Sequence, residues 1–97
     1  MDLTNIPIVK ITWHDAQDAE SGWLERTDME DSPLAVCQDV GWLLVDNEEK
    51  VVIMKSQIEG EEMGGGCTAI PHSWVQKIEV LEPAFELKEV QGQVIDV

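Results

Sequence analysis

The sequence predicts an all-β domain: a small, strongly bent barrel of five short strands, with one short helical turn before the last strand. Two apolar runs, residues 40–45 and 51–54, flank a short polar segment, an arrangement typical of a β-hairpin. An earlier segment, residues 8–14, alternates apolar and polar side chains with a period of two, as half-buried strands do. The chain has 97 residues, so one compact barrel or an oligomer is favoured over a sprawling fold.

The central stretch, residues 34–57, contains the predicted hairpin. Both apolar runs are rich in Val, Ile and Trp, whose branched or flat side chains suit a pleated, buried surface. Asp46 and Asn47 lie between the runs, and such residues tolerate turn backbones and hydrogen-bond to them. Gly41 lies inside the earlier run, where a glycine usually marks a bend or bulge. We expect that bend to help the barrel close.

The first strand is predicted over residues 8–14, with Val9, Ile11 and Trp13 on its buried side. Residues 15–33 show no clean period and have an acidic surplus, so a long loop is expected, with a helical turn around residues 21–24. Trp23 and Leu24 are its bulky residues. We expect both to anchor the loop onto the barrel.

The second half of the chain supplies the remaining elements. In chain order we expect a flexible, acidic, glycine-rich hairpin loop at residues 58–66, a fourth strand at 67–70, a tight helical turn at 71–74 and a fifth strand at 75–81. Residues 1–82 then form the barrel domain, and residues 83–97 form a tail that is either an edge strand or loose. The predicted core comprises Ile11, Val40, Leu44, Val51, Ile53, Ile70 and Ile78.

The charge of the chain is strongly acidic. Six basic residues stand against twenty acidic ones, for a formal net charge of -14. Such a charge repels nucleic-acid phosphates, so binding of DNA or RNA through an ordinary basic face is disfavoured. The acidity is concentrated in residues 14–32, where seven carboxylates accompany Arg26 alone.

The sequence also bears on location and redox state. No apolar run approaches the ~20 residues needed to span a bilayer, and the first residues lack the basic and apolar segments of a secretion signal. A soluble, cytoplasmic protein is expected. Cys37 and Cys67 have no metal-type spacing, and we expect two buried, reduced thiols.

The order of these elements resembles the Sm-like barrel. The sequence is also similar to a family of small bacteriophage and marine phage metagenome (cyanophage-like) proteins. The matching segments are VKITWHDA at residues 9–16, VGWLL at 40–44, VVIMKSQ at 51–57 and AIPHSWVQKIEVL at 69–81. The resemblance implies an Sm-like fold, ring-type homo-oligomers and, for a phage protein, the host cytoplasm. It implies no catalytic residue.

The chain departs from true Sm proteins at their RNA-binding loops. Those loops carry a polar Asp/Asn pattern after the third strand and an arginine-glycine turn before the last. Here the corresponding segments, residues 46–49 and 69–72, contain no arginine. Without basic groups to contact phosphate, RNA binding by the Sm mode is not expected.

Few residues are candidates for chemistry. His14 could act as a base oriented by Asp15, but adjacent strand residues point to opposite faces, so a surface pair is the interpretation. His14 and His72 lack the spacing of a zinc site. The glycines at 64–66 lack the lysine and helix of a phosphate-binding loop. We expect no enzyme, no metal and no cofactor, and keep His14, His72 and Lys55 as candidate ligand or partner contacts.

The tryptophans are candidates for both core and contact. Trp13, Trp42 and Trp74 are expected to supply core. The functional alternative is a partly exposed indole that stacks on a base or seats a partner. Trp23 and Trp74 lie in predicted non-strand segments, so they are the candidates for such contacts.

Three functions are compatible with these observations. The first is a non-catalytic, oligomeric phage accessory protein whose Sm-like ring binds nucleic acid or a nucleotide-like ligand. The alternative is an acidic module that binds and blocks a basic host protein surface, as a mimic of nucleic-acid charge. The third is a purely structural subunit. The presence or absence of a basic surface in the folded protein discriminates between the first two.

Overall fold

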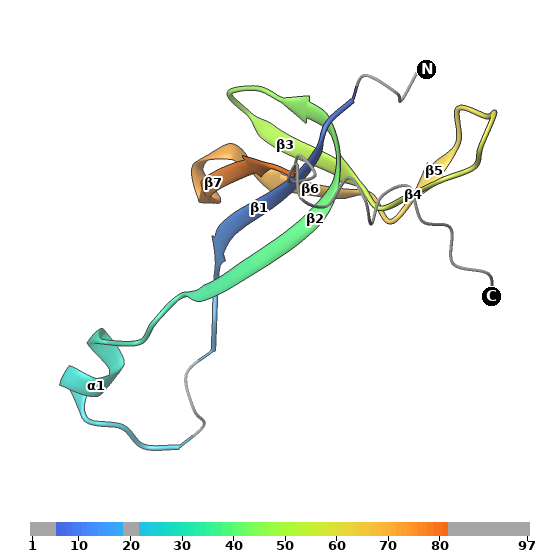
Figure 1. Ribbon diagram of the computed structural model, residues 1–97. Coiled ribbons are helices and arrows are strands. Elements are labelled where there is room, and N and C mark those ends of the chain that lie inside the picture. Colours follow the sequence, from blue (N-terminus) through green and yellow to red (C-terminus); the bar gives the residue numbers. More distant parts are fainter. Residues whose placement is uncertain (1–5, 19–21, 82–97) are drawn as a thin grey trace, which may run out of the picture.

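The computed structural model describes residues 6–18 and 22–81 and is mostly β (Figure 1). Five strands form one antiparallel sheet in the order β6–β3–β2–β1–β7, and β4 and β5 form a second sheet. The all-β prediction is confirmed. Within the described residues the five-stranded sheet does not close, and β6 and β7 are its edges. The strands are β1 (Ile8–Asp15), β2 (Ala35–Asp46), β3 (Lys50–Met54), β4 (Ser56–Gln57), β5 (Gly64–Gly65), β6 (Thr68–Pro71) and β7 (Val75–Val80).

The predicted central hairpin is confirmed as the antiparallel pair of β2 and β3. Asn47 makes its turn: the side-chain oxygen accepts hydrogen bonds from the backbone N–H groups of Glu49 and Lys50, both at 2.9 Å. This is the local bonding for which turns favour Asn. The strand register shifts between Leu43 and Val45, so one extra residue of β2 bulges there and the strand bends.

Gly41 has a different role from the predicted bulge. The bulge lies further along β2, whereas Gly41 pairs with Val9 on the buried side of the sheet. A Cβ atom at Gly41 would lie 2.7 Å from the backbone carbonyl oxygen of Met54 and 3.3 Å from the Cβ of Ile53. Glycine is therefore needed at this position because the backbone of β3 approaches closely.

The core lies on the inner face of the sheet. Its fully buried side chains are Val9, Ile11, Val51, Ile53 and Ile70. Of the other predicted core residues, Leu44 and Ile78 are half-buried. Val40 was predicted to be buried, but it is 47% exposed, because it pairs with Lys10 and shares the outer face of β1 and β2 with that lysine.

The connection between β1 and β2 projects from the sheet (Figure 1). We call residues 16–34, of which 19–21 are not described, the arm. Its helix α1 (Arg26–Glu30) begins after the predicted turn at residues 21–24, and an ion pair of 2.8 Å joins Arg26 to Glu30 one turn later. Trp23 is fully exposed, so its predicted role as an anchor is wrong. Leu24 is half-buried.

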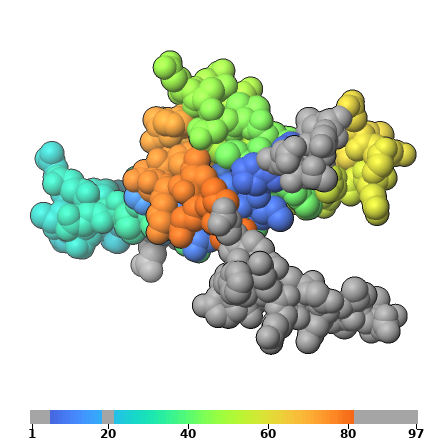
Figure 2. Space-filling view, turned by 45° about the horizontal axis from the view of Figure 1, so that its top comes forward, coloured from blue at the N-terminus to red at the C-terminus, as the bar shows by residue number. Residues whose placement is uncertain are grey.

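The rest of the chain follows the predicted order. The glycine-rich segment forms the β4–β5 hairpin, and a single 3₁₀ turn, η2 (His72–Trp74), separates β6 from β7. The predicted tail, residues 83–97, lies outside the described residues. Cys37 is half-buried and Cys67 is exposed, and both are free thiols. The expectation of burial is therefore wrong for Cys67. Figures 1 and 2 place the arm and the β4–β5 hairpin at opposite ends of the molecule.

Candidate functional site

Two predicted contact residues meet in one cluster on the inner face, which we call the Trp13 cluster: Trp13, Asp39, Lys55 and Trp74. The rings of Trp13 and Trp74 stack with their centroids 6.2 Å apart and an interplanar angle of 13°. The indole N–H of Trp13 donates to Asp39 at 2.8 Å, and the ammonium of Lys55 donates to the other carboxylate oxygen at 2.9 Å. The cluster thus joins η2, β1, β2 and the end of β3.

Strand geometry positions these side chains. Trp13 pairs with Cys37, and Asp39 lies two residues further along β2 on the same face, a diagonal distance that a tryptophan side chain can reach. Lys55 follows directly after β3, which lies beside β2 in the sheet. Trp74 ends the 3₁₀ turn and is 41% exposed. Trp74 therefore belongs at the rim of the sheet, and the expectation that it supplies core is wrong.

The environment of Asp39 favours its ionised form. Partial burial opposes ionisation, but the hydrogen bonds from Lys55 and Trp13, together with the charge of Lys55, outweigh it. The pKa of Asp39 consequently lies below its ordinary value of 3.8. A carboxylate whose folded pKa is depressed contributes stability above the unfolded pKa, and that contribution is lost as the pH falls through the folded pKa.

Replacing Asp39 with Asn tests this cluster. We expect Asp39→Asn to lower the free energy of unfolding at pH 7 by about 1–3 kcal/mol. Lys55 loses its counter-charge, and the amide keeps one acceptor oxygen for two donors, Lys55 and Trp13. The difference from the wild type should shrink as the pH falls below about 3.8. Urea unfolding followed by tryptophan fluorescence at pH 7 and in acid measures both effects. The exposed Asp46→Asn is the control, and a deficit for Asp39→Asn that is unchanged in acid would contradict the assignment.

The other predicted contact residues do not join this cluster. His14 lies on the outer face of β1 opposite Val36, and Asp15 lies on the inner face opposite Ala35, so the two side chains diverge as expected. His72 is exposed at the start of η2. Among residues 6–18 and 22–81, no group of three or more His, Cys, Asp or Glu side chains is arranged to hold a metal ion.

The sequence interpretation missed Asp39 and assigned Trp13 to the core alone. A signal was present: Asp39 falls in the inward-facing row of β2, between Cys37 and Gly41. A carboxylate in such a row requires a partner, because a buried charge without one is costly. That reasoning identifies Asp39 as a bonded residue, although it does not identify Lys55 as its partner.

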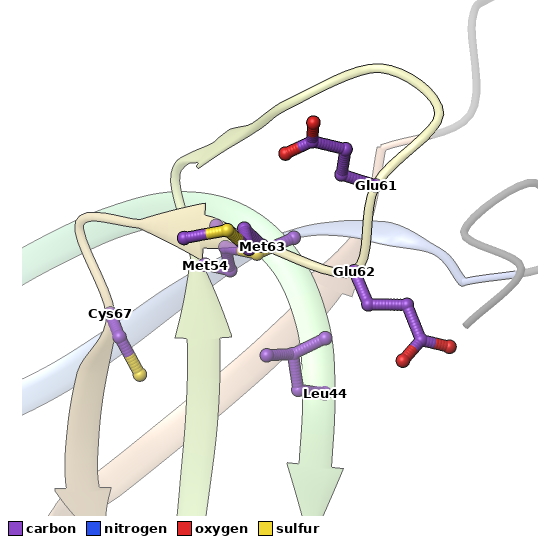
Figure 3. A pocket seen from close by; sticks show the side chains of 7 residues that line it. Leu44, Met54, Glu61, Glu62, Met63 and Cys67 are labelled. Carbon is purple, nitrogen blue, oxygen red and sulfur yellow. The ribbon is translucent and has the colours of Figure 1, made fainter.

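A second candidate site lies under the β4–β5 hairpin (Figure 3). It is a pocket of about 230 Å³. Figure 3 places the side chains of Met54 and Met63 side by side at its centre, with Leu44 from β2 nearby and Glu61 and Glu62 on the hairpin loop. Gly64 and Cys67 complete its lining. The walls are thus largely apolar and the rim is acidic.

Among the residues that the structure describes, no helix is both long enough and apolar enough to cross a membrane. Compared with models of protein families, with curated proteins and with solved structures, the chain matches none of them.

Proposed function

We propose that the chain is a non-catalytic binding module that docks an acidic surface on a basic partner protein, acting as a mimic of nucleic-acid charge. One observation carries this proposal: four of the five described Lys and Arg side chains are paired with carboxylates. The pairs are Lys10 and Lys77 with Glu79 at 3.5 and 3.3 Å, Arg26 with Glu30 at 2.8 Å, and Lys55 with Asp39 at 2.9 Å. Each nearby carboxylate reduces the positive charge that a phosphate group would meet.

The positions of the lysines support the same conclusion. Lys10 and Lys77 share one carboxylate on the outer face of the sheet. Lys55 is bonded to Asp39, which lies on the inner face. Folding of the described residues therefore places Lys55 on the opposite face from Lys10 and Lys77, so the three lysines do not form one basic groove. With a net charge of -14, the field around the protein attracts a basic partner and repels a polyanion.

The arm is the surface that fits a basic partner best. Its described residues carry five carboxylates and one cation, Arg26, which is bonded to Glu30. A hollow of about 250 Å³ in the arm is lined by Asp18, Asp28 and Asp31 beside Leu24. Close by in the sequence, Trp23 is fully exposed. Exposed tryptophans are the residues that most often become energetic centres of interfaces.

Assembly through the sheet edges belongs to the same proposal. The strand order β6–β3–β2–β1–β7 and the 3₁₀ turn between β6 and β7 support an Sm-like arrangement, in which the last strand returns to pair with the first. Strand edges without a partner favour pairing with another subunit, and a ring removes them. A phage origin and a place in the host cytoplasm rest on the sequence resemblance alone.

Nucleic acid or a nucleotide-like ligand is the alternative partner, and the exposure of Trp23 and Trp74 supports it. An indole can stack on an unpaired base with about 1–3 kcal/mol per base without needing a positive charge. This mode applies to single strands and free nucleotides, because the bases of a duplex are already stacked. The experiment therefore has to compare three classes of ligand.

The test titrates the full chain against a labelled 20-residue peptide rich in Lys and Arg, a labelled duplex and a labelled single strand. We expect the peptide to bind at about 10 µM or tighter and to weaken between about 50 and 200 mM salt, while the duplex does not bind. Trp23→Ser should weaken peptide binding about tenfold, whereas Val36→Ser, which replaces an exposed apolar residue on the outer face of β2, should not. Light scattering on the same samples should report a species several times the 10.9 kDa chain mass.

Three outcomes would each contradict a part of the proposal. Submicromolar duplex binding that weakens steeply with salt would restore nucleic acid as the partner. Peptide binding equal for Trp23→Ser and Val36→Ser would remove the arm from the interface. A monomer at every concentration would remove the ring, while leaving the acidic module in place.

A further inference from the structure

The pocket under the β4–β5 hairpin is formed by the fold itself. Met54, the last residue of β3, is 7% exposed, and its sulfur occupies the space that a Cβ at Gly64 would need. Two backbone hydrogen bonds hold the hairpin over it: Lys55 N–H to the carbonyl of Gly65 and Ile58 N–H to the carbonyl of Met63, each 3.1 Å. The pocket therefore exists before any ligand arrives, which lowers the entropy lost on binding.

The size of the pocket points to a single side chain. Its volume is about 230 Å³, whereas pockets for drug-sized ligands and cofactors span about 300–1,000 Å³. Apolar anchors at protein interfaces fill pockets of one-residue size. Methionine walls adapt to anchors of differing shape, because the thioether chain is flexible and polarisable.

The charge at the rim restricts what can carry that side chain. Residues 58–66 contain three glutamates and no Lys or Arg, and Glu61 and Glu62 line the pocket. A second copy of the chain brings a net charge of -14. The chain's own residues 82–97 bring four carboxylates against one lysine. Like charges close together are repulsive, so both are poor occupants.

We infer that the pocket receives one leucine- or methionine-sized side chain from a basic segment of a partner protein. The Lys or Arg residues that flank this side chain would then lie near Glu61 at the rim of the pocket. This inference rests on the proposed function and names the chemical form of the partner. The apolar side chain fills the space between Leu44, Met54 and Met63, while the flanking cations stay at the acidic rim. The arm binds charge and this pocket selects the anchor.

Two labelled five-residue peptides of equal charge test the inference: a leucine flanked by two lysines on each side, and the same peptide with glycine in place of leucine. We expect the full chain to bind the leucine peptide at least about tenfold more tightly than the glycine peptide. This difference corresponds to the burial of one leucine side chain. A third peptide, with the lysines replaced by serines, should bind at least tenfold more weakly than the leucine–lysine peptide.

Variants assign the preference to the pocket. Met63→Ser removes an apolar wall at an exposed position, so folding should be unaffected. We expect it to bring the leucine-to-glycine affinity ratio close to one. Val36→Ser is the control: Val36 is also exposed but lies on the outer face of β2, outside the pocket and the arm, and the ratio should stay near its wild-type value.

The possible results separate this inference from the proposed function. If both lysine peptides bind equally and Met63→Ser changes nothing, the pocket assignment is overturned while binding of basic partners stands. If neither peptide binds and the 20-residue peptide also fails, the proposed function itself is overturned. Tight binding of the serine-flanked peptide would overturn the role of the acidic rim.

Discussion

Ile53→Ala is expected to lower the free energy of unfolding by about 2–5 kcal/mol, a large fraction of the whole stability of a small domain. Ile53 is fully buried in β3, where it pairs with Leu43 of β2 and Thr68 of β6. Among residues 6–18 and 22–81 the core has five fully buried side chains. A core of this size has few neighbouring side chains that could move to fill the cavity. Thermal or urea unfolding measures the loss.

Two further variants calibrate this result. Ile78→Ala removes a half-buried side chain that packs against the core, so its cost should be smaller than that of Ile53→Ala. Val36→Ala removes a side chain that is 66% exposed and should change the free energy of unfolding by about 0.5 kcal/mol or less. Equal melting temperatures for Ile53→Ala and Val36→Ala would mean that the strand register is wrong.

Gly41→Ala should destabilise the fold by about 1–3 kcal/mol through overpacking. The added methyl group would lie 2.7 Å from the carbonyl oxygen of Met54, and that oxygen belongs to the backbone of the neighbouring strand. A flexible side chain could move away, but here β2 and β3 would have to separate where Trp42 pairs with Met54. We expect a lower melting temperature and a lower urea concentration at the unfolding midpoint.

Gly65→Ala is the matched control for this substitution. Gly65 also lies in a strand, it does not have a positive φ, and a Cβ atom placed there meets nothing within 4 Å. Alanine at such a position is tolerated and can stabilise slightly, because it restricts the unfolded chain. If both glycine variants melted at the same temperature as the wild type, close approach of β3 would not be the reason for Gly41.

Local patterns were sufficient to predict most strands. The alternation in residues 8–14 and the paired apolar runs around Asn47 predict β1, β2 and β3, because strand faces follow a period of two and turns require particular residues. Side-chain direction in β2 was harder to predict. Val40 lies in an apolar run, and hydrophobicity alone cannot identify its face, whereas the pairing of Gly41 with Val9 fixes Val40 on the outer side.

Long-range contacts account for the remaining differences. Nothing near Trp23 in the sequence indicates that the arm projects away from the core, so an anchoring role was the natural expectation for a large apolar residue. The Trp13 cluster joins residues up to 61 positions apart in the chain, and the pocket forms only when the hairpin folds over Met54. Such juxtapositions depend on strand order, which local periodicity does not specify.

The separation of the arm from the β4–β5 hairpin has a consequence for avidity. The longest dimension of the molecule is 55 Å, and an extended polypeptide needs about 16 residues to cover that length. A five-residue ligand can therefore engage one end at a time, whereas a longer basic segment can engage both. Once one end is bound, the second contact becomes intramolecular, and its strength depends on how closely the spacer matches the span. Under the proposed function, this separation of the two ends would favour partners in which the apolar anchor and the basic stretch are a matching distance apart.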